Sequence, residues 1–394
     1  MGHDQAGDDV LKRILIIPAS YPPVLGGVQT VAQRLVRHLI ESHHQVEVLT
    51  RRYPRRLPAM EVIEGVPIHR RPFQPSPFEG LQRMRPDLAL RACLSLPIDR
   101  RVGRRILERF DPTLVNIHFP DWQVDLIPFI RSLKRSRLVV SLHGDEVMRA
   151  VKGEGGQRDR LLTALRAADF VTACSGWLLE QAIRLEPAVK AKSMVIWNGF
   201  DAKGAGTLDA SPHKRPYMLG FGRFVEKKGF DLLIEAFAGL EVDLDLVLVG
   251  SGPERERLSG LTEKLGLSGR VFFPGRAYPD EMNRWIGGAR LAVVPSREEP
   301  FGIAALEVVG AGTPLVATTV GGMTEFLEPL VDDSEAIRLC DVTVGSIRNA
   351  IHDLLKKEAG TGKPSVQADR IRDRFDWSRR ILDYDAAFAA AERA

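Results

Sequence analysis

The chain has 394 residues, of which 44% are hydrophobic and 27% charged, values close to those of an average globular protein. This composition argues against a disordered chain, and the absence of a run of about 18 apolar residues argues against a membrane-spanning one. The net charge is +4, and the three widely spaced cysteines fit neither a disulfide framework nor a zinc cluster.

The first residues, MGHDQAGDDVLKR, include acidic side chains and no apolar stretch, so we expect no secretory signal. Ala6 does not match the myristoylation pattern, which needs a serine or threonine at that position. Together with reduced cysteines, these features predict a cytoplasmic protein.

Short β-rich apolar runs alternate with longer amphipathic stretches along the chain, a pattern typical of βαβ units and parallel sheets. In the first half we predict six strands, beginning at Arg13, Gln45, Leu114, Arg137, Phe170 and Met194. The proline-rich stretch from about residue 53 to residue 97 gives no clear element. In the second half we predict five strands, beginning at Tyr217, Asp245, Val271, Arg290 and Pro314.

Each set of strands can form one doubly wound parallel sheet, so the predicted class is α/β with two Rossmann-like domains. Residues 198–216 are rich in Gly, Pro, Asp and Ala and have no periodicity, which is typical of a linker. We therefore predict domains at 10–205 and 206–376, followed by a helix over 377–394 that packs back toward the first domain. Ligands bind beyond the carboxyl ends of parallel strands, so a cleft between two such edges is the expected active site.

The segment SREEPFGIAALEVVGAGTP, residues 296–314, places a loop between a strand and a helix. Glu299 lies in this loop and Glu307 lies in the helix, and both can face one ligand over the helix N-terminus. Two carboxylates can accept hydrogen bonds from the vicinal hydroxyls of a sugar or a ribose. The alternative interpretation is a capping acid followed by an exposed helical glutamate.

The segment GFGRFVEKKGFDLLIEAF places Arg223 and Lys228 after another strand, on a loop that leads into a helix. Two cations at the carboxyl edge of a sheet are suited to a diphosphate whose charge grows as it departs. The alternative is an ordinary basic loop. The glycines do not form a dinucleotide fingerprint, since Gly220 and Gly222 lack the third glycine.

These two segments together resemble the signature of retaining GT-B glycosyltransferases of family 4, which has two glutamates around a Phe-Gly and, upstream, an Arg and a Lys-Gly. The likeness covers most of the chain and is strongest from residue 217 to residue 322. It implies a fold of two Rossmann-like domains that face each other across a cleft, with the acceptor bound by the first domain and the nucleotide sugar by the second. It also implies that no cofactor is needed, because the nucleoside diphosphate sugar is itself the donor substrate.

The resemblance also implies the roles of individual residues. Arg223 and Lys228 bind the donor pyrophosphate, Glu299 contacts the sugar hydroxyls, and Glu307 contacts the ribose. The donor site on this side is completed by Phe301, Gly302 and Ile303. Further candidates are His118, Asp145, Gly222, Arg276 and Glu325. The region after Glu325 looks shortened relative to the family, which leaves the contacts there open.

In the first half, Gly26 and Gly27 stand between the first strand and a helix that we expect to begin near Val28. Bare backbone at a helix start lets a phosphate or sugar come close, although a Gly-Gly pair is also typical of a simple turn. His143, in SLHGDE, follows a strand and is either a structural histidine or a site residue. The resemblance places the two glycines over the donor and His143 beside the transferred sugar, as a catalytic residue together with Arg223, Lys228 and Glu299.

Asp243 and Asp245 spell an Asp-x-Asp pattern, which binds a metal in the other major glycosyltransferase fold. They stand at the start of a predicted strand, opposite the edge where the diphosphate is expected. We therefore interpret them as structural and predict no metal site, with activity retained in the presence of a chelator.

Residues 51–110 hold 14 arginines against 6 acids. Such a stretch can attract a phosphorylated or lipid-linked acceptor or an anionic membrane surface, or it can be a solvated basic face. No recognition module for nucleic acid accompanies it. The stretch includes Arg51, Arg52, Arg55, Arg56, Arg70, Arg71, Arg100, Arg101, Arg104 and Arg105.

Our leading hypothesis is a metal-independent transferase that moves a sugar from a UDP-, GDP- or ADP-sugar to an acceptor hydroxyl with retention of configuration, in the synthesis of a cell-envelope glycan, glycolipid or polysaccharide. Two alternatives remain open: a nucleotide-sugar epimerase of the same fold, and a non-catalytic sugar-nucleotide-binding module. The predicted location is the cytoplasm, with contact at the inner face of the membrane if the basic stretch binds lipid.

Overall fold

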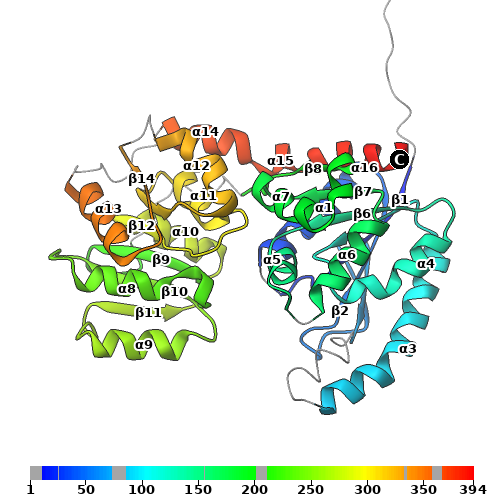
Figure 1. The fold of residues 1–394 in the computed structure, drawn as a ribbon, viewed down its shortest axis with the longest axis horizontal. Coiled ribbons are helices and arrows are strands. Elements are labelled where there is room, and N and C mark those ends of the chain that lie inside the picture. The colour runs from blue at the N-terminus through cyan, green and yellow to red at the C-terminus, as the bar shows by residue number, and fades with distance from the viewer. Residues whose placement is uncertain are drawn as a thin grey trace, which may run out of the picture. The chain divides into compact units, whose positions relative to one another are not determined.

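The computed structural model describes residues 11–24, 26–72, 86–154, 156–200, 211–331, 335–356 and 366–394 (Figure 1). The chain divides into two compact units. Unit 1 contains Met1–Ile196 and Ile381–Ala394, and unit 2 contains Trp197–Arg380. The predicted boundary near residue 205 lies outside the described residues. Among the described residues, no helix combines the length and apolar character needed to cross a bilayer.

Unit 1 is built on an eight-stranded sheet with the order β3-β4-β2-β1-β5-β6-β7-β8. Every neighbouring pair is parallel except β3 and β4, which form an antiparallel hairpin. The strands are β1 (Arg13–Pro18), β2 (Gln45–Arg51), β3 (Met60–Ile63), β4 (Val66–Arg71), β5 (Leu114–His118), β6 (Arg137–Leu142), β7 (Phe170–Ala173) and β8 (Ser193–Val195).

The helices of unit 1 cover both faces of this sheet, so its central strands are buried along most of their length. In β1, for example, Ile14, Leu15, Ile16 and Ile17 are all fully buried. The helices are α1 (Gly27–Glu41), α3 (Pro86–Phe110), α4 (Ile127–Ser132), α5 (Asp145–Val151), α6 (Gln157–Ala167), α7 (Gly176–Leu185) and α16 (Asp383–Arg393), with short 3-10 helices η1 (Trp122–Leu126) and η2 (Pro187–Lys192).

Unit 2 is built on a six-stranded parallel sheet with the order β11-β10-β9-β12-β13-β14. Its strands are β9 (Tyr217–Arg223), β10 (Asp245–Ser251), β11 (Val271–Gly275), β12 (Leu291–Val294), β13 (Leu315–Thr318) and β14 (Ile337–Cys340). Its helices are η3 (Glu226–Lys228), α8 (Phe230–Ala238), α9 (Arg255–Lys264), α10 (Pro279–Gly288), α11 (Ile303–Gly310), η4 (Gly321–Met323), α12 (Thr324–Val331), α13 (Val344–Lys356), α14 (Val366–Phe375) and α15 (Trp377–Arg380).

All eleven predicted strands are present, and three further strands were missed. The hairpin β3–β4 lies in the stretch that gave no clear element, because β4 carries His69 and Arg70, two polar side chains that are nevertheless buried. The strand β14 lies in the region after Glu325 that looked shortened. This region therefore contains a strand: β14 follows helix α12 and completes the sheet.

The C-terminal segment also differs in detail from the prediction of one helix. Two helices are formed, α15 and α16, and α16 packs against β6 and β7 of unit 1. The preceding helix α14 packs instead against α11 in unit 2, where the Arg372 guanidinium donates a hydrogen bond to the Gly310 carbonyl over 2.8 Å. The last residues of the chain are thus integral to the first unit.

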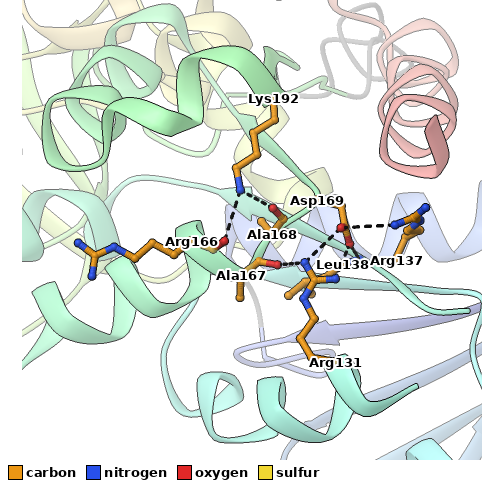
Figure 2. A network of polar contacts seen from close by, with 8 residues as sticks. All are labelled: Arg131, Arg137, Leu138, Arg166, Ala167, Ala168, Asp169 and Lys192. Carbon is orange, nitrogen blue, oxygen red and sulfur yellow. Dashed lines mark hydrogen bonds and ion pairs between the residues drawn. The ribbon is translucent and has the colours of Figure 1, made fainter. Parts of the chain in front are cut away.

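The amino edge of the first sheet is closed by a polar network around Asp169 (Figure 2). Its carboxylate accepts hydrogen bonds from the Arg131 guanidinium at 2.9 Å and from the Leu138 N–H at 2.7 Å. Lys192 donates to the carbonyls of Arg166 and Ala168 at the end of α6. The charged side chains of Asp169 and Lys192 are thus engaged within the protein, where they stabilise the fold. The candidate site lies at the opposite edge of the sheet.

Candidate active site

The strand order of unit 2 reverses its direction between β9 and β12, and in doubly wound sheets ligands bind beyond the carboxyl ends of the strands at this switch point. The two strands pair only at Leu291 with Met218 and at Ala292 with Leu219. Beyond these pairs β9 continues to Arg223, whereas β12 ends at Val294. The loops that leave the two strands carry the predicted cations and carboxylates, so the topology brings both segments to the same edge of the sheet.

The Lys228 ammonium and the Glu299 carboxylate are in direct contact, as a hydrogen-bonded ion pair between these two loops. Lys228 is the last residue of η3, and Gly229 follows with a φ of 66° in the left-handed region. A Cβ on Gly229 would collide with the carbonyl oxygen of Pro295, at the start of the other loop. The Lys-Gly pair is therefore needed for the close approach of the two loops as well as for charge.

Glu299 is held firmly in place. It is 7% exposed, and its carboxylate also lies 3.3 Å from the Ser296 hydroxyl, which donates to it. Its carbonyl accepts the Gly322 N–H over 3.0 Å, and a Cβ on Gly321 would collide with that same carbonyl. The Gly321-Gly322 pair therefore packs directly on the main chain of Glu299.

The helix α11 begins at Ile303, with Gly302 as its N-cap. Gly302 has no side chain that could cap the helix, so the first N–H groups of α11 receive no hydrogen-bond acceptor from the N-cap side chain. Glu307 lies about one turn after Ile303 in α11, and Ile303 is half-buried. Phe301 is 3% exposed and packs against Phe326 at a centroid distance of 5.4 Å. Only the main chain of Phe301 is therefore available to a ligand.

Two arginines stand at the other strand ends of this edge. Arg223 is exposed and is the last residue of β9, aligned with Ser251 at the end of β10. Arg276, also exposed, follows β11, and its guanidinium donates to the Ser251 hydroxyl. The candidate Gly222 precedes Arg223 in β9, and Glu325 lies in the first turn of α12.

One supporting side chain was not predicted. Arg297 makes a bidentate pair with Asp231, with distances of 2.7 and 2.9 Å, and donates to the Glu226 carbonyl over 2.9 Å. Its N–H also donates to the Lys227 carbonyl over 2.7 Å. These bonds tie the loop of Glu299 to the loop of Lys228. The only signal in the sequence is the position of Arg297 between the strand and the acidic pair.

At the carboxyl edge of unit 1, Gly26 is the N-cap of α1 and Gly27 is its first residue. The Gly26 carbonyl accepts the N–H of Thr30 over 3.0 Å, which starts the helix. The loop before it is braced by a side-chain hydrogen bond from Gln29 to Ser20. The helix thus starts one residue before the predicted Val28, with the glycine pair at its N-terminus.

His118 and His143 end up side by side at the same edge. His118 Nδ1 lies 3.0 Å from His143 Nε2, and the rings stack with centroids 5.3 Å apart. Burial lowers the pKa of His143 to about 4 and lowers that of His118 well below its ordinary value. Both rings are therefore neutral near pH 7. Asp145, the candidate that follows, is the first residue of α5.

A buried glutamate next to this pair was missed by the sequence analysis. Glu146 is fully buried, and its carboxylate accepts the N–H groups of His143 and Gly144, the latter over 3.0 Å. Burial raises the pKa of Glu146 to about 7, although these main-chain hydrogen bonds lower it. The Glu in SLHGDE was visible, but nothing local indicates that it turns inward.

Asp243 and Asp245 are both engaged by nearby cations. Asp245 begins β10, is 1% exposed and lies 2.7 Å from His213 Nε2. Asp243 is paired with Arg215, whose guanidinium also lies 3.3 Å from the Asp245 carboxylate. Both aspartates are thus ion-paired at the amino edge of the sheet.

The chain has two doubly wound α/β units, and their carboxyl-edge loops carry glycines, cations and carboxylates. Proteins of this fold class bind ligands beyond the carboxyl ends of their parallel strands. A family model described as "Glycosyl transferases group 1" matches residues 209–369, and one described as "Glycosyltransferase Family 4" matches residues 25–203. The chain therefore belongs to the GT-B glycosyltransferases of family 4.

Individual relatives agree with this family. An uncharacterized glycosyltransferase of Methanocaldococcus jannaschii is 28% identical over 80% of this chain and 83% of its own length. A glycogen synthase of Mycobacterium tuberculosis is 27% identical over 97% and 95%. Among solved structures, sucrose-phosphate synthase from Thermosynechococcus elongatus has a TM-score of 0.77 at 24% identity, covering 96% of this chain and 99% of that one. The predicted family and GT-B fold are confirmed.

Proposed function

We propose that the protein transfers a sugar from a nucleoside diphosphate sugar to an acceptor hydroxyl with retention of configuration and without a metal. The observation that carries this proposal is the contact between Lys228 and Glu299, on two loops at the carboxyl edge of one sheet. Two solved structures of the Anabaena protein HepE, with TM-scores of 0.69 and 0.71, are described as complexes with UDP and with UDP-glucose. A nucleotide sugar is thus a reasonable ligand for the same fold here.

The opposite charges of the pair suit the two ends of such a donor. In this proposal Lys228 and Arg223 bind the diphosphate, whose negative charge increases as the bond to the sugar breaks. Glu299 accepts hydrogen bonds from sugar hydroxyls, and Glu307 accepts them from the ribose. The N-terminus of α11 adds main-chain N–H donors for an anion or a hydroxyl oxygen.

In this mechanism the bond between the anomeric carbon and the diphosphate oxygen breaks as the acceptor oxygen approaches on the same face of the sugar. A new bond forms between the anomeric carbon and the acceptor oxygen, and the acceptor proton passes to the leaving phosphate. No protein nucleophile is required, so the contribution of the enzyme is orientation and electrostatic stabilisation.

The test begins with a screen of thermal stabilisation by UDP, GDP, ADP and their sugars, because a bound donor raises the melting temperature. With the donor found, Arg223→Ala and Lys228→Ala should each lower kcat by about 100-fold or more. Lys264→Ala, which removes an exposed lysine of α9, is the matched control. Unchanged turnover in both site variants would remove the electrostatic argument.

The same material separates the alternatives. Product analysis distinguishes a glycoside from an isomerised sugar nucleotide, which would indicate an epimerase. Donor hydrolysis without acceptor distinguishes an enzyme from a binding module. The anomeric configuration of the product tests retention, and turnover in a chelator tests independence from metal.

We also propose that the helix α3 contacts an anionic surface, such as a lipid-linked acceptor in its membrane. Parts of the basic stretch are ion-paired, as in Arg100 with Asp125 and Arg104 with Glu108. Arg101 and Arg105 are exposed, with no ion pair to any described residue, and Ile98 is 64% exposed one turn before Arg101. An exposed apolar side chain beside two cations on one helix face suits a bilayer surface. Cosedimentation with phosphatidylserine vesicles should be lost in an R101A/R105A variant, and equal binding to neutral vesicles would contradict this proposal.

A further inference from the structure

The two histidines at the carboxyl edge of unit 1 share one hydrogen bond. β5 ends at His118, and His143 directly follows the end of β6, so the parallel pairing of these strands places the rings together. The hydrogen bond between the rings joins His118 Nδ1 to His143 Nε2, over 3.0 Å. Since both rings are neutral, each carries a single N–H, and one ring donates while the other accepts.

The surroundings decide which ring donates. His118 Nε2 is buried and has no hydrogen-bond partner among the described residues. If His143 donated, His118 would carry its proton on Nε2, as a buried N–H without an acceptor. If His118 donates from Nδ1, its Nε2 is a bare nitrogen, with no proton left unsatisfied. Buried N–H groups without a partner are rarer than buried acceptors without one, so the second arrangement is favoured.

The other charged and titratable groups near the pair do not change this assignment. Glu146 binds the main-chain N–H of His143, not its ring. The Cys174 thiol lies 3.6 Å from the His143 carbonyl and donates to it. Tyr384 of α16 packs beside His118 with a centroid distance of 6.0 Å, and its hydroxyl is hydrogen-bonded to Ser141. The main chain of His143 is thus held at both its N–H and its carbonyl.

The remaining ring nitrogen of His143 is the accessible one. Nδ1 of His143 has no partner among the described residues, and it is not one of the buried unpartnered atoms. His143 itself is partly exposed, whereas His118 is completely buried. A donor fixed on Nδ1 would therefore point its proton at whatever binds beside this ring.

We propose that His118 is a positioning residue, which holds His143 in the tautomer with its proton on Nδ1 so that His143 presents a fixed N–H donor to the ligand. The role of this donor in sugar transfer rests on the proposed function. The assignment of the tautomer does not rest on the proposed function, because it follows from the contacts of His118 and His143 within the chain. The donor suits a hydroxyl or carbonyl oxygen, and it does not suit a group that needs an acceptor.

The first experiment measures the tautomer directly. Two-bond ¹H–¹⁵N correlation spectra of the ligand-free full chain, labelled with ¹⁵N-histidine at neutral pH, distinguish protonated from bare ring nitrogens. The expected result is a protonated Nδ1 and a bare Nε2 for both His118 and His143. A protonated Nε2 on His143, or a mixture of the two tautomers, would overturn the proposal whether or not transferase activity has been found.

The second experiment uses variants of His118. In His118→Asn the side-chain amide can donate from about the position of Nδ1, whereas His118→Leu has no donor. We expect His118→Leu to lower kcat by about tenfold, as for one lost hydrogen bond, and to give His143 a mixture of tautomers. His118→Asn should restore most of the rate and the single tautomer.

The matched control is His69→Asn, because His69 is also a buried histidine of this sheet but is bound to Glu47 over 2.8 Å. It should lower thermal stability without changing the His143 spectrum. If His118→Leu keeps the single tautomer and the full rate, or if His118→Asn is as impaired as His118→Leu, His118 does not position His143.

Discussion

Replacing Glu299 by Gln should strengthen the binding of a nucleoside diphosphate while weakening sugar transfer. Lys228 is paired with Glu299, and a diphosphate has to separate this pair before it can bind the ammonium. A Gln at this position would leave Lys228 available. The lost carboxylate would also no longer repel the diphosphate, which acts in the same direction.

The size of the effect follows from the exposure of the pair. The side chains of Lys228 and Glu299 are 22% and 9% exposed, so their attraction is screened less than that of a surface pair. Two unit charges 4 Å apart attract by about 4 kcal/mol at an effective dielectric constant of 20. Loss of hydration offsets much of this, which leaves a net value of about 1–2 kcal/mol. At about 1.4 kcal/mol per factor of ten, diphosphate affinity should rise about tenfold.

The assay is calorimetric titration with the nucleoside diphosphate that stabilises the protein most, followed by steady-state kinetics with its sugar. Glu299→Gln should bind the diphosphate about tenfold more tightly, and kcat should fall because a neutral amide holds sugar hydroxyls less strongly. Glu235→Gln, on the exposed face of α8, removes the same charge and should leave both values unchanged. In a Lys228→Ala background, Glu299→Gln should gain less affinity, since the pair is already broken. Unchanged or weaker diphosphate binding by Glu299→Gln would refute the reasoning.

Two further predictions concern stability. Gly229→Ala should lower the melting temperature by several degrees and reduce donor binding, because the left-handed backbone and the Pro295 carbonyl both exclude a Cβ; Gly266→Ala, with φ of 69° and open space, isolates the backbone part. Burial raises the pKa of Glu146 from its ordinary 4.5 to about 7. Between these two pH values the folded protein therefore holds a proton that the unfolded chain has lost. The stability that this group contributes is fully present below about pH 4.5 and falls by about 3 kcal/mol as the pH rises through 7. In Glu146→Gln, urea unfolding measured at several pH values should no longer show this fall in the free energy of unfolding. A pH dependence like that of the natural protein would contradict the assignment.

Much of the candidate site could be predicted from the sequence because each part is a local pattern. A strand, a loop with two charges and a helix start within about 15 residues, and this pattern made Arg223, Lys228, Glu299 and Glu307 candidates, with a basic loop and a capping acid as the alternatives. The carboxyl ends of parallel strands share one edge, so even the meeting of the two loops followed from the class of fold. The resemblance to family 4 then supplied the roles that the residues alone left open.

Other features depend on partners that are distant in the chain. The strand β4 was missed because Arg70 looks like a surface residue, yet it is 1% exposed and its guanidinium is paired with Glu61 over 2.6 Å. The Arg297 pair with Asp231 spans 66 positions, and no local pattern predicts it. The position of α16 on β6 and β7 likewise follows from packing rather than from the composition of the last residues.

The sequence by itself determined the class of fold and the residue types at each strand end, because hydrophobic periodicity and turn residues act over a few positions. Only the tertiary structure decided how these groups are held: which carboxylate meets Lys228, which nitrogen of His118 lacks a partner, and which glutamate is buried. Such details depend on the register of neighbouring strands and on the solvent excluded between them. Contact and burial between distant segments set the charge and proton positions of this site.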